Sequence, residues 1–169
     1  MSQKFAIFGN PVSHSKSPQM QNAGLKYIGF KGIYEKHHLE NGNDIKNTFL
    51  QNNYLGANIT VPHKEFAYEN ADEIRGLAKE IKAVNTYILE NGKVVAYNTD
   101  APGFLKAIES FGTIKNVLLL GAGGTAKAIA LALKSKDIKV TVLNRSEGKL
   151  DFFKEHQIAC FSWENFEHT

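Results

Sequence analysis

Residues 116–126 carry the sequence NVLLLGAGGTA, an apolar run that leads directly into a glycine-rich turn. A continuous run of valine and leucine is typical of a parallel strand buried on both faces, so we expect a central strand over 116–120. The turn matches the pattern G-x-G-x-x-A, with Gly121, Gly123 and Ala126 in the key positions. The first glycine makes a tight turn, the second lets a pyrophosphate approach the backbone, and the small third residue lets the helix lie close to the strand.

The residues around this turn are expected to form a β-α-β unit. An alanine-rich helix follows the turn, further strands are predicted over 139–143 and 158–161, and residues 150–156 are predicted to be helical. The start of the alanine-rich helix offers N–H groups and a partial positive charge to a phosphate. A glycine turn that merely connects strand to helix is the alternative. The predicted pyrophosphate contacts are Gly121, Ala122, Gly123, Gly124, Thr125 and Ala126.

The end of the strand over 139–143 indicates which dinucleotide binds. A site specific for NAD usually places an acid there to hold the ribose hydroxyls, but this chain has Asn144, Arg145 and Ser146. The planar guanidinium of Arg145 suits a 2′-phosphate, Ser146 adds a hydroxyl, and Lys149 follows one turn later. We therefore predict NADP as the cofactor, with solvated surface charges as the alternative for Arg145 and Lys149.

The composition is that of an ordinary globular protein. The chain has 169 residues, of which 43% are hydrophobic and 22% charged, which excludes a disordered chain, a collagen and a coiled coil. A net charge of +3 is too small to suggest nucleic-acid binding. The single cysteine, Cys160, can form neither an internal disulfide nor a cysteine zinc site, and no histidine has companions at metal spacing. A reducing, cytoplasmic setting fits this single cysteine, and we expect no metal site. Residues 5–8 form an apolar stretch too short for a signal-peptide core or a membrane span, so we expect no membrane segment.

The first part of the chain alternates short apolar runs with helical patterns. Asn91-Gly92 suits a type I′ turn and predicts a hairpin between residues 84–89 and 93–97. Further strands are expected over 4–8, over 57–61 and, at a sheet edge, over 32–39.

Helices are expected between these strands. Ser17 is predicted to cap a helix whose apolar face holds Met20, Ala23 and Tyr27, and residues 44–52 form a short one. A helix from Asp72 would carry Ile74, Leu77, Ala78 and Ile81, and one capped by Thr99 or Asp100 would carry Phe104, Leu105, Ile108 and Phe111.

Polar side chains gather near the expected strand ends. They lie in the segments 14–17, 58–64, 84–86 and 98–100. These segments offer hydroxyls, amides, one lysine and one carboxylate, a set suited to binding a small polyhydroxylated acid. Ser15 and Ser17 can donate to the carboxylate of such an acid. Lys64 can exchange a proton with the oxygen at the reacting carbon. Each also has a simpler explanation, since Ser17 and Asp100 can merely cap helices and an isolated Lys64 would be a surface lysine.

Together these segments resemble the shikimate dehydrogenase family. Residues 8–18 look like its substrate-carboxylate loop, 58–64 like its lysine motif, 83–86 and 97–100 like its next two motifs, and 121–126 with 144–146 like its NADP motifs. The resemblance implies an NADP-dependent oxidoreductase that reversibly reduces 3-dehydroshikimate to shikimate, on the route to chorismate and the aromatic amino acids. It assigns Lys64 and Asp100 as the catalytic pair. The implied substrate contacts are Ser15, Ser17, Thr60, Lys64, Asn85 and Asp100.

The resemblance also implies a division of the chain. We expect an α/β protein with a mostly parallel substrate domain over residues 1–101 and a partial Rossmann-like NADP domain over 102–169. Family members continue well beyond Thr169 with the second half of the nucleotide domain, a substrate glutamine and C-terminal helices, so the activity of this shorter chain is left open. The alternatives are a quinate/shikimate dehydrogenase and a non-catalytic substrate-binding module. A monomer and a homodimer are both compatible with the sequence.

Overall fold

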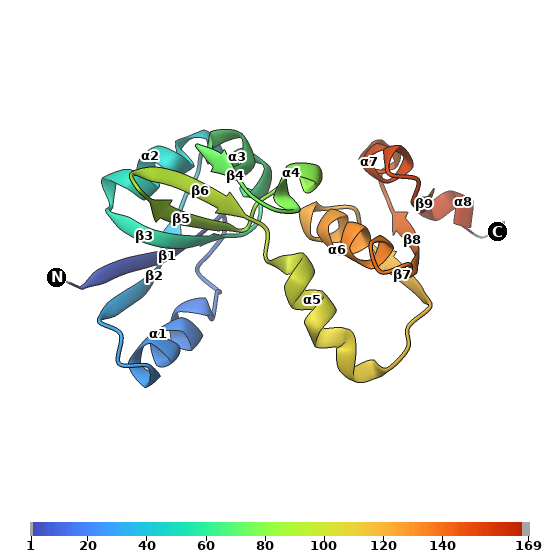
Figure 1. The fold of residues 1–169 in the computed structure, drawn as a ribbon. Coiled ribbons are helices and arrows are strands. Elements are labelled where there is room, and N and C mark those ends of the chain that lie inside the picture. The colour runs from blue at the N-terminus through green and yellow to red at the C-terminus, as the bar shows by residue number, and fades with distance from the viewer. Residues whose placement is uncertain (1, 167–169) are drawn as a thin grey trace. The chain divides into compact units, whose positions relative to one another are not determined.

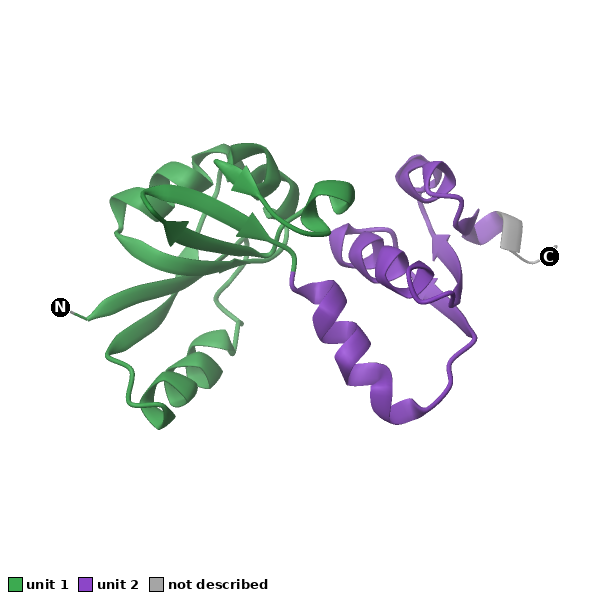
Figure 2. Ribbon diagram, viewed as in Figure 1, with its two compact units in different colours: residues 1–98 green, residues 99–169 purple. Residues whose placement is uncertain are grey.

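The computed structural model describes residues 2–166 and separates into two compact units. The first unit spans Met1–Asn98 and the second Thr99–Thr169. Figure 2 colours them green and purple. Both units are α/β, as the sequence predicts, and each has its own sheet.

The first unit is built on a six-stranded mixed sheet in the order β2-β1-β3-β5-β6-β4 (Figure 1). The pairs β1–β2, β1–β3 and β4–β6 are parallel, and β3–β5 and β5–β6 are antiparallel. The predicted edge strand, β2, lies at an edge. The strands are β1 (Gln3–Gly9), β2 (Gly32–His38), β3 (Tyr54–Ile59), β4 (Glu73–Ile74), β5 (Thr86–Glu90) and β6 (Lys93–Tyr97).

The hairpin between β5 and β6 is confirmed, with Glu90 opposite Lys93. Asn91 and Gly92 have φ of 50° and 76°. Positive φ at both central residues is what a type I′ turn requires, and asparagine and glycine adopt it at low cost. The turn fixes the register that faces Tyr87, Val94 and other buried residues toward the core.

Four short helices and one 3-10 turn complete the first unit. They are α1 (Ser17–Tyr27), η1 (Gly42–Asp44), α2 (Ile45–Gln51), α3 (Lys64–Asn70) and α4 (Ala78–Ile81). Ile45 and Phe49 of α2 are fully buried, as their four-residue spacing predicts.

The predicted apolar face of α1 is wrong. Met20 is 67% and Tyr27 92% exposed, and Ala23 is exposed as well. The inward face instead carries Asn22 and Leu25. The amide of Asn22 donates to the Tyr34 carbonyl and accepts from the Tyr34 N–H, both at 2.8 Å, so a polar residue that satisfies the edge strand β2 determines which side faces inward.

The helix predicted from Asp72 is also wrong at its start. Glu73 and Ile74 form β4 beside β6, and the helix α4 begins only at Ala78. Asp72 bridges the segments: its backbone N–H donates to the Val94 carbonyl and its carboxylate accepts from the Val94 N–H, each at 2.9 Å. Pairing with β6 outweighs the helical spacing here.

The second unit has a three-stranded parallel sheet in the order β7-β8-β9. Its strands are β7 (Asn116–Leu120), β8 (Lys139–Asn144) and β9 (Ala159–Ser162). Its helices are α5 (Asp100–Ile108), η2 (Glu109–Phe111), α6 (Gly124–Lys134), η3 (Glu147–Lys149), α7 (Asp151–Glu155) and α8 (Trp163–Phe166). The buried side of the sheet carries Val140 and Val142, and α6 contributes Ala128, Leu131 and Leu133 to the same core.

The expectation that β7 is buried on both faces is wrong for the described residues. Among them β7 has one strand neighbour, β8, and Leu118 and Leu120 are 50% and 67% exposed. Part of the apolar surface of β7 is therefore left exposed by the sheet and helices of residues 99–166.

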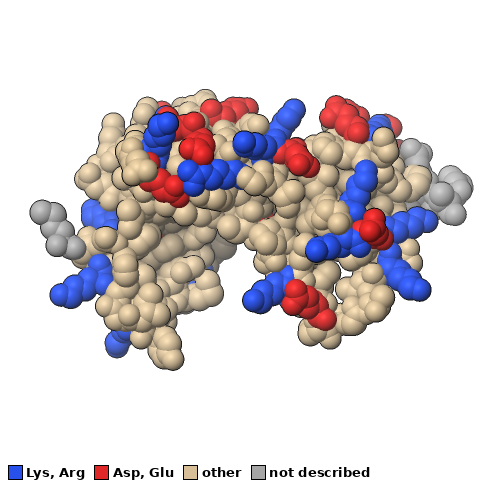
Figure 3. Space-filling model, in the orientation of Figure 1, with Lys and Arg blue, Asp and Glu red and all other residues tan. Residues whose placement is uncertain are grey.

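No helix within residues 2–166 is long and apolar enough to cross a membrane. On the face drawn in Figure 3, basic and acidic side chains are interspersed over the second unit and the upper part of the first, while the lower part of the first unit shows only scattered basic side chains. Charge alone therefore does not mark a site on this face, and the site is located from the strand ends.

Candidate active site

Two loops of the first unit are joined where β1 and β3 end. The Thr60 N–H donates to the Phe8 carbonyl at 2.9 Å, and the Asn10 N–H donates to the Val61 carbonyl at 3.1 Å. Because β1 and β3 are parallel neighbours, their carboxyl ends meet at one edge of the sheet. The segment of Ser15 and the segment of Thr60 and Lys64 both leave from this edge.

Gly9 allows the two loops to approach closely. A Cβ atom on Gly9 would lie 2.6 Å from Cγ2 of Thr60 and 3.4 Å from Cβ of Val12. A real Cβ cannot be accommodated at 2.6 Å without movement of the threonine. The glycine thus places Thr60 against the strand that leads to Ser15.

The loop before β5 joins the same edge. The Ile59 N–H donates to the Asn85 carbonyl at 2.8 Å, and the Val84 N–H donates to the Lys64 carbonyl at 2.9 Å. Asn85 is 8% exposed, and its amide oxygen accepts from the Thr86 hydroxyl at 2.9 Å. The structure therefore brings Thr60, Lys64 and Asn85 together through backbone bonds, although 25 positions separate the first from the last in the sequence.

The serine pair behaves differently from the sequence prediction. The N-cap of α1 is Lys16, and no side-chain hydrogen bond from Ser17 caps the helix. Instead Oγ of Ser15 accepts from the Ser17 N–H at 3.2 Å, and the Ser15 N–H donates to the Val12 carbonyl at 3.0 Å. Ser17 is thus not needed as a cap, which leaves its hydroxyl available for another role.

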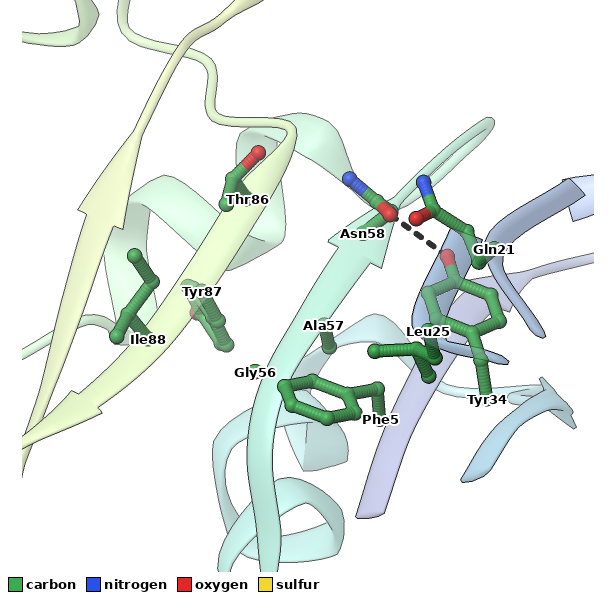
Figure 4. Close-up of a pocket in the computed structure, with 10 residues that line it drawn as sticks. All are labelled: Phe5, Gln21, Leu25, Tyr34, Gly56, Ala57, Asn58, Thr86, Tyr87 and Ile88. Atoms are coloured by element: carbon green, nitrogen blue, oxygen red, sulfur yellow. Dashed lines mark hydrogen bonds between the residues drawn. The ribbon is translucent and has the colours of Figure 1, made fainter. Parts of the chain in front are cut away.

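A pocket of about 240 Å³ opens beside these loops, between α1 and the sheet (Figure 4). Asn58 and Thr86, which are register partners on β3 and β5, form its polar end. Phe5, Leu25 and Ile88 line its apolar part.

Tyr34 positions the asparagine of this pocket. Its hydroxyl donates to Oδ1 of Asn58 at 2.6 Å, the bond drawn dashed in Figure 4. Burial raises the pKa of Tyr34, so the hydroxyl keeps its proton and remains a donor. The bond fixes the Asn58 amide with its N–H₂ group directed away from Tyr34. Sequence reasoning missed Tyr34 because it lies on another strand, 24 residues from Asn58.

Asp100, the predicted partner of Lys64, is the first residue of α5 and belongs to the second unit. Within that unit its Oδ2 accepts from the Thr125 hydroxyl at 3.1 Å. Thr125 is the second residue of α6 and lies within the segment 121–126 that carries the glycine-rich motif. The carboxylate assigned to catalysis is therefore hydrogen-bonded to the segment assigned to the pyrophosphate.

The glycine-rich turn has a backbone that fits a dinucleotide. Gly121 has a φ of 109°, a conformation that other residues rarely adopt, and its N–H donates to the Leu143 carbonyl at 2.7 Å. A Cβ on Gly121 or Gly123 would meet no atom within 4 Å, so the surface above the turn is open. The first turn of α6 directs backbone N–H groups past the helix end, and the first helical bond runs from Lys127 to Gly123.

The predicted 2′-phosphate residues lie at the carboxyl end of β8. Asn144 is its last residue, and its amide donates to the Ser146 carbonyl at 2.8 Å, which bends the chain there. Arg145 and Ser146 are exposed beyond it, and Lys149, also exposed, ends the 3-10 turn η3. Because β7 and β8 are parallel, these residues and the glycine turn share one edge of the second sheet. Within residues 2–166, no group of three or more His, Cys, Asp and Glu side chains could hold a metal.

Comparison with known proteins finds similar sequences and similar solved structures. Residues 7–87 match the family model of the shikimate dehydrogenase substrate binding domain. A curated NADP(+)-dependent shikimate dehydrogenase from Helicobacter hepaticus is 44% identical over 166 residues, which is 98% of this chain and 62% of the relative.

Solved structures agree with the sequence comparison. The crystal structure of shikimate dehydrogenase from Aquifex aeolicus matches with a TM-score of 0.87 at 36% identity, over 95% of this chain and 62% of that one. The enzyme from Thermus thermophilus in complex with NADP(H) and shikimate matches with a TM-score of 0.84 at 35% identity, over 94% and 62% of the two chains. The chain thus spans about three-fifths of the length of these relatives.

Proposed function

We propose that this chain carries the chemistry of the NADP-dependent shikimate dehydrogenases to which it is similar, the reversible NADPH-dependent reduction of 3-dehydroshikimate to shikimate. The observation that carries the proposal is the joining of the loops after β1 and β3 and before β5 at one sheet edge. This edge gathers Thr60, Lys64 and Asn85, which are hydroxyl, ammonium and amide groups suited to a polyhydroxylated acid. The solved relative from Thermus thermophilus holds shikimate and NADP(H) together.

The substrate contacts follow from the chemistry of each side chain. We assign Ser15 and Ser17 to the substrate carboxylate, because their hydroxyls can donate to it. Thr60 and Asn85 bind the ring hydroxyls, and Asn58, held by Tyr34, presents an amide at the neighbouring pocket. Residues 1–101 form the substrate domain in this proposal, and residues 102–169 are assigned to nucleotide binding.

Lys64 is assigned to donate and accept the proton at the substrate oxygen. When bound, the nicotinamide supplies or accepts the hydride at the reacting carbon. In the reducing direction the substrate oxygen gains negative charge, which the Lys64 ammonium stabilises before it donates a proton. In the reverse direction Lys64 takes that proton back. Asp100 is assigned as the second member of the catalytic pair, since a carboxylate can accept a hydrogen bond from the same substrate hydroxyl.

The NADP site is assigned to the glycine turn and the end of β8. The pyrophosphate is placed at residues 121–126, which include a positive-φ glycine and the start of α6. The 2′-phosphate is assigned to Arg145, with Asn144, Ser146 and Lys149 beside it. We place the protein in the cytoplasm, where its single cysteine would remain reduced.

A second candidate function is a binding module that holds shikimate without turning it over. The observation that favours it is that the loops carrying Thr60, Lys64 and Asn85 are joined by backbone hydrogen bonds within the first unit alone. A quinate/shikimate dehydrogenase is distinguished by its second substrate.

The test is shikimate oxidation by the purified chain with NADP⁺, followed by reduced-nicotinamide absorbance, together with a calorimetric titration of shikimate. Turnover with NADP⁺ supports the dehydrogenase, and comparable turnover of quinate supports the broader enzyme. Binding without turnover supports the module. The absence of both binding and turnover would overturn the assignment of the site in this chain.

A further inference from the structure

Trp163 lies at the same sheet edge as the predicted cofactor residues. Ser162, the last residue of β9, pairs with Asn144, the last residue of β8, and Trp163 follows directly as the first residue of α8 (Figure 1). Because β7, β8 and β9 are parallel, Gly121, Asn144 and Trp163 stand in a row at their carboxyl ends. Trp163 lies outside the sequence motifs, because its position at this edge depends on the pairing of β9 with β8.

These residues line one opening. Leu120, Gly121, Asn144, Arg145 and Trp163 line an open depression of about 650 Å³, which is within the range of about 300–1,000 Å³ typical of small-molecule sites. The opening is thus bounded by the turn assigned to the pyrophosphate and by the arginine assigned to the 2′-phosphate. Both groups are attached to the adenosine ribose of NADP, at its 5′ and 2′ oxygens, so the adenine on the same ribose must lie close to this opening.

The surfaces around the opening suit a flat aromatic ring next to an anion. Leu120 is 67% and Trp163 55% exposed, so a leucine and an indole both contribute apolar surface to the lining. Aromatic side chains stack on nucleobases, and a guanidinium can pair with phosphate while it stacks on a ring. The Asn144 amide is held by its bond to the Ser146 carbonyl, which leaves the strand end in a fixed conformation.

We propose that the indole of Trp163 packs against the adenine ring of the cofactor and fixes it beside Arg145. This inference rests on the proposed NADP site and adds a residue to it. Trp163 acts as a binding residue for the adenine half and takes no part in proton or hydride transfer.

The chain contains a single tryptophan, so its fluorescence reports on this position alone. The probe is adenosine 2′,5′-bisphosphate, which has the adenine and the 2′-phosphate but no nicotinamide. We expect it to quench the emission of Trp163 in a saturable manner. Nicotinamide mononucleotide, which lacks the adenine, is expected to leave the emission unchanged.

Variants test whether the indole contributes to binding. Trp163→Ala is expected to weaken calorimetric binding of the bisphosphate by about 5- to 30-fold, the lower part of the range for base stacking on an aromatic side chain. Trp163→Phe should keep most of the affinity, because it retains a ring. Lys139→Met, at the amino end of β8, is the matched control and should bind like the unmodified chain.

The outcomes separate this inference from the proposed function. If the bisphosphate binds but neither quenches Trp163 nor loses affinity in Trp163→Ala, the inference is overturned and the cofactor site stands. If the bisphosphate does not bind at all, the proposed cofactor site fails and the inference with it. Emission that depends on protein concentration and ignores the nucleotide would instead show a second copy covering the indole.

Discussion

Lys64→Met removes the ammonium group and leaves a side chain of similar length. The carbonyl of Lys64 accepts from the Val84 N–H at 2.9 Å, and the residue begins α3. Its backbone is therefore held independently of the side chain, so the substitution is expected to change chemistry more than structure. A positioned proton donor contributes about 10²–10⁴-fold to a rate, which corresponds to about 2.7–5.5 kcal/mol of barrier. We expect kcat for shikimate oxidation to fall by that factor.

Affinity should change much less than rate. One lost hydrogen bond from a charged group costs about 1.5–2 kcal/mol at an exposed site, so shikimate binding measured by calorimetry should weaken about 12- to 30-fold. Lys4→Met is the control, because Lys4 is an exposed lysine at the amino end of β1, the opposite end from the site. Loss of affinity with an unchanged kcat would show that Lys64 only binds. An unchanged rate and affinity would refute its place in the site.

Three further predictions concern the cofactor, the loops and the tyrosine. Arg145→Met should weaken NADP⁺ binding about 12- to 30-fold, because one exposed charged hydrogen bond contributes about 1.5–2 kcal/mol. NAD⁺ binding should stay unchanged. Equal losses of affinity for both nucleotides in calorimetry would contradict the 2′-phosphate assignment. Gly9→Ala should destabilise the chain by about 1–3 kcal/mol in urea unfolding, because its Cβ would lie 2.6 Å from a threonine methyl, and an unchanged midpoint would exclude that clash. Burial raises the pKa of Tyr34 in the folded state, so the free energy of unfolding should fall as the pH rises above about 10. Tyr34→Phe should make the free energy of unfolding fall less over this pH range. Identical pH profiles for the two proteins would contradict the role of Tyr34.

The sequence predicts the elements whose signals are local. The hairpin at Asn91-Gly92 and the turn at Gly121 follow from backbone conformations that few other residues adopt. The short helix with Ile45 and Phe49 follows from spacing, because both side chains are buried in one core.

The errors arise where tertiary contacts override local signals. The inward face of α1 is set by the Asn22 amide bonded to β2, a partner that periodicity does not reveal. Residues 73 and 74 pair with β6 despite their helical spacing. Tyr34 and Trp163 enter their sites only through strand pairing, so no local motif could have identified them.

The most direct test of the account is an amide chemical-shift titration of the isotope-labelled chain with shikimate. The account predicts that the shifted amides cluster in the loops at this sheet edge, in residues 12–17, 58–64 and 84–86. The opposite edge, at the amino ends of β1, β2 and β3 around residues 3, 32 and 54, should stay unchanged. Shifts at the amino ends with none in the loops, or no shifts at saturating shikimate, would contradict the claim that this edge is the substrate site.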